Sequence, residues 1–268
     1  MKIAIVTGAS SGIGREFVKQ AGHFYRTLDE VWVIARRGHR LQELNVLSTV
    51  PVRILEGDLL HEAVYEQLGT MLEKEKPDIR MLVNAAGFGK SGPVEEILSE
   101  DKRAQLEMID LNCRALSRIT FECLPYLSKG SRILNMASAA AFCPQPLFSV
   151  YAATKAYVLS FSRSLGAELR NRGIYVTAVC PGPVDTEFFR VSGELENPLK
   201  KLTKVKAPGV VKKALQDSRA GKDISIYGFP LKGAHIASKL LPHHFLLNLM
   251  MVFNPNDIQR CAASKLVE

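Results

Sequence analysis

A tyrosine and a lysine, Tyr151 and Lys155, stand four residues apart at the start of a segment with a helical pattern. On a helix this spacing places both side chains on one face, where they can share a site. A tyrosine with a pKa of about 10 is a poor base at neutral pH, but a neighbouring ammonium favours its phenolate. The pair is therefore a candidate proton shuttle, in which we expect Lys155 to lower the pKa of Tyr151.

A third candidate, Ser138, follows the mostly apolar run 133–137 and precedes Tyr151 by thirteen residues. If that run is a strand of a parallel sheet, the hydroxyl group emerges at the carboxyl edge of the sheet, beside the phenol. Ser138 would then orient and polarise the oxygen atom of a substrate. The three residues together suit proton transfer to or from a carbonyl or hydroxyl oxygen.

A glycine-rich turn, Thr7-Gly8-Ala9-Ser10-Ser11-Gly12-Ile13-Gly14, lies between a short apolar run and a helical pattern. Its glycines let the backbone turn tightly and approach a pyrophosphate, and a helix N-terminus offers free N–H groups and the positive end of a dipole. The turn therefore predicts a dinucleotide site. Its expected contacts are Gly8, Ser10, Ser11, Gly12, Ile13 and Gly14.

Two arginines, Arg36 and Arg37, follow the second apolar run, where an NAD site would place a carboxylate for the ribose 2′-hydroxyl. A guanidinium at this point can bind a 2′-phosphate through charge-assisted hydrogen bonds. We therefore predict NADP(H) as the cofactor, with Arg36 as the main contact and Arg37 as the second. Two solvated arginines at a helix start are the alternative.

The elements that must position these residues alternate between short β-branched runs and amphipathic stretches. This alternation predicts a single α/β domain over residues 1–268, a Rossmann-type doubly wound parallel sheet of about seven strands with helices on both faces. The expected strands are 3–7, 31–35, 52–56, 81–84, 132–137, 175–180 and 224–227, and the expected helices are 14–27, 38–48, 61–76, 101–128, 151–171 and 208–220.

Three further motifs complete the pattern: Asp58-Leu59, Asn84-Ala85-Ala86-Gly87 and Pro181-Gly182-Pro183-Val184-Asp185-Thr186. With the glycine turn and the Tyr151/Lys155 pair, they recur in the order typical of one family over residues 3 to 227. The chain resembles a short-chain dehydrogenase/reductase of the single-domain branch. Ala85 departs from the family pattern, because it replaces a second asparagine and removes one side-chain amide.

The resemblance implies further contacts. Asp58 and Leu59 would lie beside the adenine, and Val184 and Thr186 would hold the nicotinamide carboxamide. Lys155 would also hold the nicotinamide ribose, and Asn112 would bend its helix and join Lys155 to solvent through water. The implied catalytic set is Asn112, Ser138, Tyr151 and Lys155, and the implied cofactor contacts add Asn84, Ala85, Ala86, Gly87, Tyr151, Lys155, Pro181 and Gly182.

The segments after Ser138 and after Thr186 are expected to flank the reacting carbon, and their large side chains predict an apolar substrate pocket. These side chains are Phe142, Leu147, Phe148, Phe188 and Phe189. Residues 187–207 are expected to close over the site as a lid. Residues 228–268 form an apolar extension, for which capping or packing is favoured over contact with a membrane surface.

These observations predict an NADP(H)-dependent oxidoreductase that interconverts a ketone and a secondary alcohol on a hydrophobic small molecule, a steroid or another lipid. Two alternatives stay open: a 3-oxoacyl-thioester reductase, and an NADP-sensing or membrane-surface protein with vestigial activity. A homodimer or homotetramer is expected through the helices at 101–128 and 151–171. The apolar residues Val158, Phe161, Leu165 and Leu169 could serve that contact or the core.

The composition, 47% hydrophobic and 23% charged, excludes disordered and fibrous classes. Five cysteines without a CxxC pair, and histidines without ligand spacing, predict neither disulfides nor a metal site. Neither a signal peptide nor a transmembrane helix is expected, and we predict a cytoplasmic protein. The net charge of +8 gathers in residues 199–239, where a solvated face is favoured over a binding patch, and a nucleic-acid partner is not expected.

Overall fold

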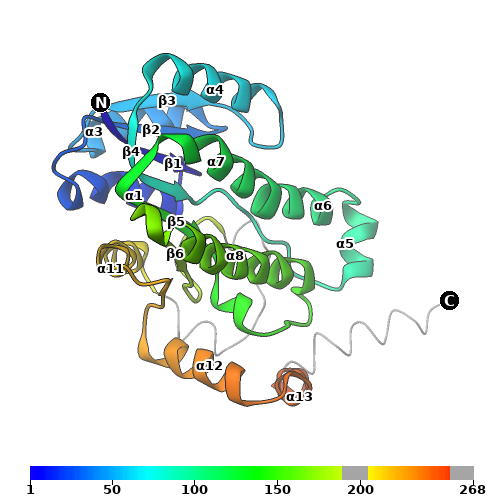
Figure 1. The fold of residues 1–268 in the computed structure, drawn as a ribbon. Coiled ribbons are helices and arrows are strands. Elements are labelled where there is room, and N and C mark those ends of the chain that lie inside the picture. Colours follow the sequence, from blue (N-terminus) through cyan, green and yellow to red (C-terminus); the bar gives the residue numbers. More distant parts are fainter. Residues whose placement is uncertain (189–204, 254–268) are drawn as a thin grey trace.

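A seven-stranded parallel sheet forms the centre of the protein, with the strand order β3-β2-β1-β4-β5-β6-β7 (Figure 1). The computed structural model describes residues 1–188 and 205–253. Strand residues alternate between two buried clusters, so that Ala4 and Val6 face one side and Ile3 and Ile5 the other. The strands are β1 Lys2–Thr7, β2 Glu30–Ala35, β3 Val52–Glu56, β4 Asp78–Asn84, β5 Leu127–Met136, β6 Tyr175–Val179 and β7 Ile224–Ser225.

Helices cover both faces of the sheet. Apolar residues of α1 (Gly12–Phe24) and α11 (Ala207–Arg219) pack against one face, and those of α4 (Ala63–Glu75), α7 (Leu116–Cys123) and α8 (Ser149–Glu168) pack against the other. The predicted fold class is therefore confirmed. The remaining helical segments are α2 Gly38–Gln42, α3 Leu44–Leu47, α5 Val94–Glu100, α6 Ala104–Ile109, η1 Asp110–Ala115, η2 Leu124–Tyr126, η3 Ala139–Phe142, η4 Arg170–Arg172, α12 Phe229–Leu240 and α13 His243–Phe253.

The stretch 101–128, predicted as one helix, is broken in the structure. It comprises α6, the π-helical turn η1, α7 and the 3₁₀ turn η2, and β5 begins at Leu127. The periodicity of the apolar residues is nearly the same in an α-helix and in a single π turn, so the sequence pattern did not reveal the break. Val158 and Leu165 of α8 and Leu169 directly after it are buried in the core, while Phe161 is partly buried.

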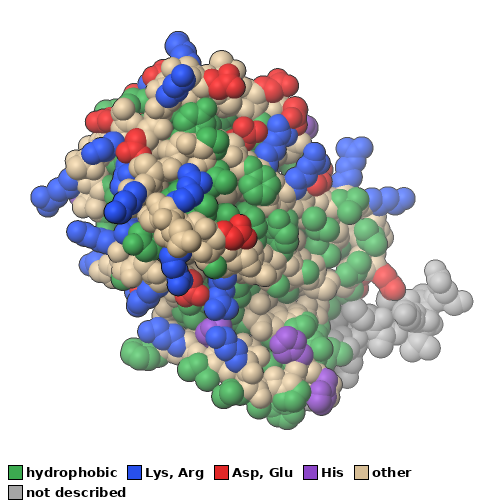
Figure 2. Space-filling view, in the orientation of Figure 1, with side chains coloured by type: hydrophobic (Ala, Val, Ile, Leu, Met, Phe, Trp, Pro, Cys, Tyr) green, Lys and Arg blue, Asp and Glu red, His purple; other side chains and the backbone are tan. Residues whose placement is uncertain are grey.

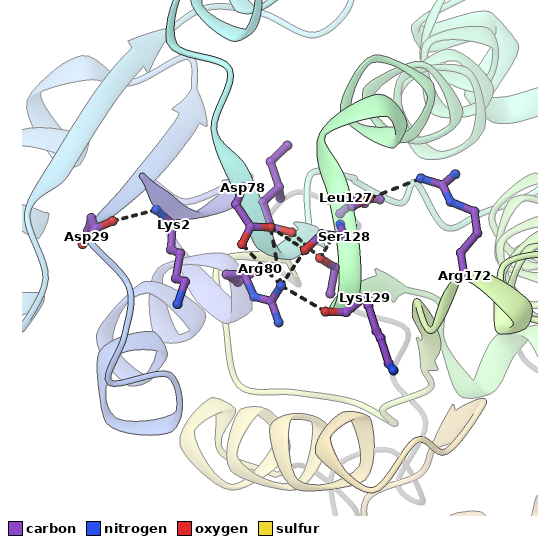
Figure 3. Close-up of polar contacts among 10 residues, drawn as sticks. Lys2, Asp29, Asp78, Arg80, Leu127, Ser128, Lys129 and Arg172 are labelled. Atoms are coloured by element: carbon purple, nitrogen blue, oxygen red, sulfur yellow. Dashed lines mark hydrogen bonds and ion pairs between the residues drawn. The ribbon is translucent and has the colours of Figure 1, made fainter.

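All strands run in parallel, so their carboxyl ends meet at one edge of the sheet. The opposite edge is held by polar contacts around Arg80 (Figure 3). The Arg80 guanidinium donates to the hydroxyl oxygen of Ser128 (2.7 Å) and to the carbonyl oxygen of Lys129 (3.2 Å), and the Ser128 hydroxyl donates to Asp78 (2.7 Å). These contacts lie where the register of β4 against β5 shifts.

Gly130 lies at this edge with a φ of +88°, a backbone conformation that residues with a side chain rarely adopt. A Cβ atom there would lie 2.8 Å from an Arg80 guanidinium nitrogen. We expect Gly130→Ala to lower the free energy of unfolding by about 1–3 kcal/mol in urea denaturation, because both strain and displacement of Arg80 oppose the native state. Gly69→Ala on α4 is the matched control.

A Cβ atom at Gly69 meets nothing within 4 Å, and the position lies inside a helix. Its replacement by alanine is therefore expected to leave stability unchanged or raise it by up to about 1 kcal/mol. Equal effects of the two substitutions would contradict the role assigned to Gly130.

Candidate active site

A cavity of about 560 Å³ opens at the carboxyl edge of the sheet and runs from the glycine turn to the start of α8. The loops that follow β1, β2, β3, β4, β5 and β6 all contribute to its wall. Most of the residues singled out in the sequence meet there. Those lining the cavity are Gly8, Ser10, Ser11, Gly12, Ile13, Gly14, Arg36, Arg37, Asp58, Leu59, Ala85, Ala86, Gly87, Ser138, Phe148, Tyr151, Lys155, Pro181, Gly182, Val184, Thr186 and Phe188.

The glycine turn leaves space that side chains would fill. A Cβ atom at Gly8, where φ is +66°, would lie 2.7 Å from the backbone nitrogen of Ala86, and one at Gly14 would lie 2.4 Å from the carbonyl oxygen of Gly8. Helix α1 begins at Gly12 without a capping hydrogen bond from the Ser11 side chain and without an acidic residue in its first turn. These features fit a pyrophosphate at the helix N-terminus.

Thr7 joins this turn to the next loop, a role that the sequence analysis missed. Its side-chain oxygen accepts hydrogen bonds from the backbone N–H groups of Ala85 (3.0 Å) and Ala86 (3.1 Å). The backbone after β4 is thereby held against the end of β1, although Ala85 lacks the amide of the family pattern. The position of Thr7 directly before Gly8 was the only signal that could have suggested this contact.

The two arginines after β2 differ in their surroundings. Arg36 is 70% exposed and lies 3.6 Å from the carboxylate of Asp58. Arg37 is less exposed, and its guanidinium donates to the Ser10 hydroxyl oxygen at 3.1 Å and 3.3 Å. Ser10 belongs to the glycine turn, so Arg37 is hydrogen-bonded to that turn. Both side chains nevertheless line the cavity.

Glu187 is a carboxylate in the segment after β6 that the sequence analysis did not single out, and it pairs with arginines that follow β2. Glu187 accepts a hydrogen bond from Arg37 at 2.9 Å and pairs with Arg40 as well. Hydrogen bonds from Arg40 and Arg37 lower the pKa of Glu187 to about 2, so that it is a carboxylate at neutral pH. The residues are about 150 positions apart in the chain, and no sequence pattern connects them.

The proposed proton-transfer residues meet at the end of β5. Tyr151 and Lys155 lie in the first two turns of α8, with the Lys155 ammonium 5.5 Å from the centre of the Tyr151 ring. The ammonium donates a hydrogen bond of 2.8 Å to the carbonyl oxygen of Met136, the last residue of β5. The Ser138 hydroxyl lies close enough to Tyr151 to lower the pKa of the phenol. All three side chains line the same cavity.

Burial shifts both pKa values toward the neutral forms of the side chains. It raises the pKa of Tyr151 to about 12, against the opposing effect of the Ser138 hydroxyl, and lowers the pKa of Lys155 to about 8. The raised pKa of Tyr151 is caused mainly by desolvation, and the expected lowering effect of Lys155 stays a prediction. Tyr151 is a protonated phenol at neutral pH.

Asn112 lies in the π-helical turn η1 and contacts the backbone beside the site. Its side chain accepts from the N–H of Phe88 (3.1 Å) and donates to the carbonyl oxygen of Phe88 (2.9 Å) and to the Thr154 hydroxyl oxygen (3.1 Å). A Cβ atom at Gly87 would approach the Asn112 side-chain oxygen to 2.6 Å, so the amide lies directly behind the cavity wall. Its link to Lys155 through water stays a prediction.

Within the described part of the chain, four of the predicted site residues do not line the cavity: Asn84, Asn112, Phe142 and Leu147. Asn84 is buried behind it, where its amide donates to Thr120 and Asn135, because the last residue of β4 points into the sheet–helix interface. Phe142 faces away and packs on His235 of α12. Leu147 is also absent from the wall, and Phe189 lies outside the described residues, as do residues 189–204 of the expected lid.

Aromatic rings flank the phenol. The Phe148 ring stacks on Tyr151 with a centroid distance of 4.2 Å, and the Phe188 ring lies 5.5 Å away. Leu147 precedes Phe148 with a φ of +62°, and its carbonyl oxygen accepts a hydrogen bond of 2.7 Å from the backbone N–H of Gly92. Leu147 thus acts through the backbone that places Phe148, a conformation that costs energy for a residue with a Cβ atom.

Neither a metal site nor a membrane-spanning helix occurs in the described part of the chain. Within residues 1–188 and 205–253, three or more His, Cys, Asp or Glu side chains never gather closely enough to hold a metal ion. Over the same ranges, every helix is too short or too polar to cross a bilayer.

The burial of Lys155 predicts a pH-dependent contribution to stability. Below pH 8 the lysine is charged in both states, and the full penalty of burying the charge is present. Between about pH 8 and 10 the unfolded chain keeps a proton that the folded protein releases, so stability rises with pH. We expect the free energy of unfolding, relative to Lys155→Met, to rise by roughly 2–3 kcal/mol over this window.

Urea denaturation of both proteins at matched pH values measures this difference, and ionisations common to both cancel. Parallel pH profiles would contradict the lowered pKa. Above pH 10 the raised pKa of Tyr151 acts in the opposite direction, because the folded protein then holds the proton that the unfolded chain loses.

Comparison with known proteins places these motifs in a family. The short chain dehydrogenase family model matches residues 2–197. An uncharacterized oxidoreductase of Staphylococcus epidermidis is 32% identical over 187 residues, which cover 69% of this chain and 79% of that protein. The very-long-chain 3-oxoacyl-CoA reductase of Anas platyrhynchos is 32% identical over 197 residues, covering 70% of this chain and 62% of the duck protein.

A solved structure agrees with this result. The short-chain dehydrogenase from Sphingobium yanoikuyae, in complex with NADPH, superposes with a TM-score of 0.74 and 27% identity, over 90% of this chain and 94% of the other. The matched segment includes the glycine turn, the Asn-Ala-Ala-Gly loop and the Tyr151/Lys155 pair. The chain belongs to the short-chain dehydrogenase/reductase family.

Proposed function

We propose that the protein is an NADP(H)-dependent oxidoreductase that interconverts a ketone and a secondary alcohol on a hydrophobic small molecule. The observation that carries this proposal is the convergence of Ser138, Tyr151 and Lys155 on one wall of a cavity whose other end is the glycine turn. A steroid or another lipid ketone is the substrate class that we favour.

The residues divide the chemistry between them. When bound, the nicotinamide supplies the hydride for ketone reduction or accepts it in alcohol oxidation. Tyr151, protonated at neutral pH, donates its phenolic proton to the carbonyl oxygen in the reductive direction and takes it back in the oxidative direction. Ser138 orients the same oxygen with its hydroxyl group. Lys155 holds the nicotinamide ribose and places a positive charge beside the phenolate that forms.

The wall around the phenol supports an apolar substrate. Phe88, Leu111, Phe148 and Phe188 line the cavity on this side, and Phe148 and Phe188 flank the Tyr151 ring itself. A carbonyl carbon that reaches the phenol must therefore pass against aromatic faces, which favours a hydrophobic skeleton over a small charged one.

The arginines support a cofactor with a 2′-phosphate. Arg36 and Arg37 line the cavity next to Ser10, and a phosphate between them would receive charge-assisted hydrogen bonds. Because Glu187 pairs with Arg37 and Arg40, its carboxylate competes with the phosphate for the same guanidinium groups. The ionic contacts of Arg37 then rearrange when NADP(H) binds, whereas NAD(H), which lacks that phosphate, leaves them in place.

A second candidate function is reduction of a 3-oxoacyl thioester. The sequence similarity to the duck very-long-chain 3-oxoacyl-CoA reductase favours it. Parallel assays with free ketones and with 3-oxoacyl-CoA or carrier-bound substrates separate the two candidates, because only the second activity requires the thioester group.

We further propose that the protein is cytoplasmic and forms a homodimer or a homotetramer. Exposed apolar side chains on α6, α7 and α8 offer a surface for a second copy, namely Leu106, Ile109, Phe121 and Tyr157. Cys113, Cys123, Cys143 and Cys180 are free thiols, which suits a reducing compartment.

Removal of the phenolic hydroxyl tests the proton-transfer role. We expect Tyr151→Phe to reduce kcat for ketone reduction with NADPH by about 10²–10⁴-fold, because the acid is lost while the ring remains. The dissociation constant for NADPH should change little. Tyr157→Phe on the same helix is the matched control, since that hydroxyl bonds to Ser117 at 2.8 Å and does not line the cavity. Nearly unchanged turnover of Tyr151→Phe would refute the assignment.

Binding measurements with both cofactors test whether Arg36 and Arg37 bind the 2′-phosphate. We expect Arg36→Ala and Arg37→Ala each to weaken the binding of NADP⁺ by about tenfold or more, because a charge-assisted hydrogen bond is lost. The binding of NAD⁺ should weaken far less. Glu187→Gln should strengthen NADP⁺ binding by about two- to tenfold, since a competing carboxylate is removed from two partly exposed ion pairs. Titration calorimetry measures both cofactors. Equal changes in the affinities for NADP⁺ and NAD⁺ would contradict a competition between Glu187 and the 2′-phosphate.

A further inference from the structure

The outer face of α12 carries apolar side chains where a surface helix normally carries polar ones. Phe229, Ile236 and Leu240 are 87%, 58% and 77% exposed. Ile236 and Leu240 follow Phe229 by seven and eleven residues, which is about two and three helical turns. The three side chains therefore share one face of the helix. Two exposed lysines, Lys232 and Lys239, border that face, and the Lys232 ammonium lies 5.2 Å from the centre of the Phe229 ring.

The inner face of α12 is already used. Leu231 packs against Gly182 of the cavity wall, where a Cβ atom would approach it to 2.8 Å, and His235 lies against the Phe142 ring with a centroid distance of 4.4 Å. The orientation of the helix is therefore fixed by packing on the domain. The exposure of the opposite, apolar face is a consequence of that packing.

Helix α13 continues this surface. Its exposed apolar residues are Phe245, Leu249 and Met251, and two exposed histidines, His243 and His244, begin it. Figure 2 shows hydrophobic side chains with lysine and histidine among them over the lower part of the molecule, where α12 and α13 lie in Figure 1. Exposed apolar side chains that gather on two successive helices are typical of an interaction site.

The charged residues on and around α12 and α13 indicate the kind of partner. Residues 224–253 contain two lysines and three histidines but neither aspartate nor glutamate. A two-fold contact between two copies would bring like charges together, which disfavours a second copy as occupant. Apolar side chains that project outward, bordered by lysines, are typical of helices that lie in a bilayer interface.

We propose that the outer faces of α12 and α13 dock on an anionic lipid surface. The apolar side chains enter the headgroup region and the lysines pair with lipid phosphates, while the domain stays in the aqueous phase. Because Leu231 contacts the cavity wall, docking brings the active site close to the phase in which a lipophilic ketone dissolves. Only this last point rests on the proposed function, since lipid binding itself does not require activity.

Vesicle flotation of the full chain tests the proposal. We expect the protein to float with vesicles that contain phosphatidylglycerol, and less with pure phosphatidylcholine vesicles or in high salt. The combined variant Phe229→Ser, Ile236→Ser, Leu240→Ser should reduce the bound fraction at least about tenfold. Lys232→Glu with Lys239→Glu should remove the preference for phosphatidylglycerol.

The matched control combines Val46→Ser, Val94→Ser and Leu98→Ser, which are exposed apolar residues on α3 and α5. It should bind vesicles like the unchanged protein. Circular dichroism checks that each variant is folded, and turnover of a water-soluble ketone without vesicles reports separately on the proposed function. Absence of vesicle binding by the unchanged protein overturns the proposal.

Two other outcomes also decide against a lipid partner. If the combined α12 variant changes the mass measured by light scattering while vesicles bind neither protein, the face is an interface between copies. If the control variant loses vesicle binding as strongly as the α12 variant, the binding is not located on α12.

Discussion

The hydrogen bond from the Lys155 ammonium to the carbonyl oxygen of Met136 is the contact on which the site depends. An ammonium buried to this degree would be expelled or neutralised without a strong acceptor. The bond joins the first turns of α8 to the last residue of β5, and therefore fixes Tyr151 relative to Ser138. The lowered pKa of the lysine is the cost of this arrangement, and a charge beside the phenol is its use.

The rest of the fold brings the loops to that contact. The parallel order of the strands collects the turns after β1, β4, β5 and β6 at one edge, where the Thr7 hydroxyl and the Asn112 amide hold the backbone of the intervening loop. The polar contacts around Arg80 stabilise the opposite edge, away from the cavity. The cavity and the Arg80 contacts thus lie at opposite ends of the strands.

Electrostatics act differently at the two ends of the cavity. Near Tyr151, burial dominates and keeps the phenol protonated. At the other end, the guanidinium groups of Arg37 and Arg40 are partly exposed to solvent, and both pair with the Glu187 carboxylate. The first arrangement suits proton transfer to a carbonyl oxygen, and the second allows an anion to be exchanged for another.

The sequence by itself determined the alternation of strands and helices, the glycine turn, the position of the two arginines after the second strand and the Tyr151/Lys155 pair. All of these follow from local spacing. Spacing specifies which residues share a helix face or follow a strand, because these relations are set by backbone geometry over a few positions. It therefore predicted the doubly wound sheet and most of the cavity wall.

Only the tertiary structure decided the remainder. The direction of the Tyr151 pKa shift depends on how deeply the surrounding elements bury it. The pairing of Glu187 with Arg37, the turn of Phe142 away from the site and the outward apolar face of α12 depend on contacts between segments far apart in the chain. Apolar periodicity shows which face of an element packs inward, but it does not show which distant segment that face will meet.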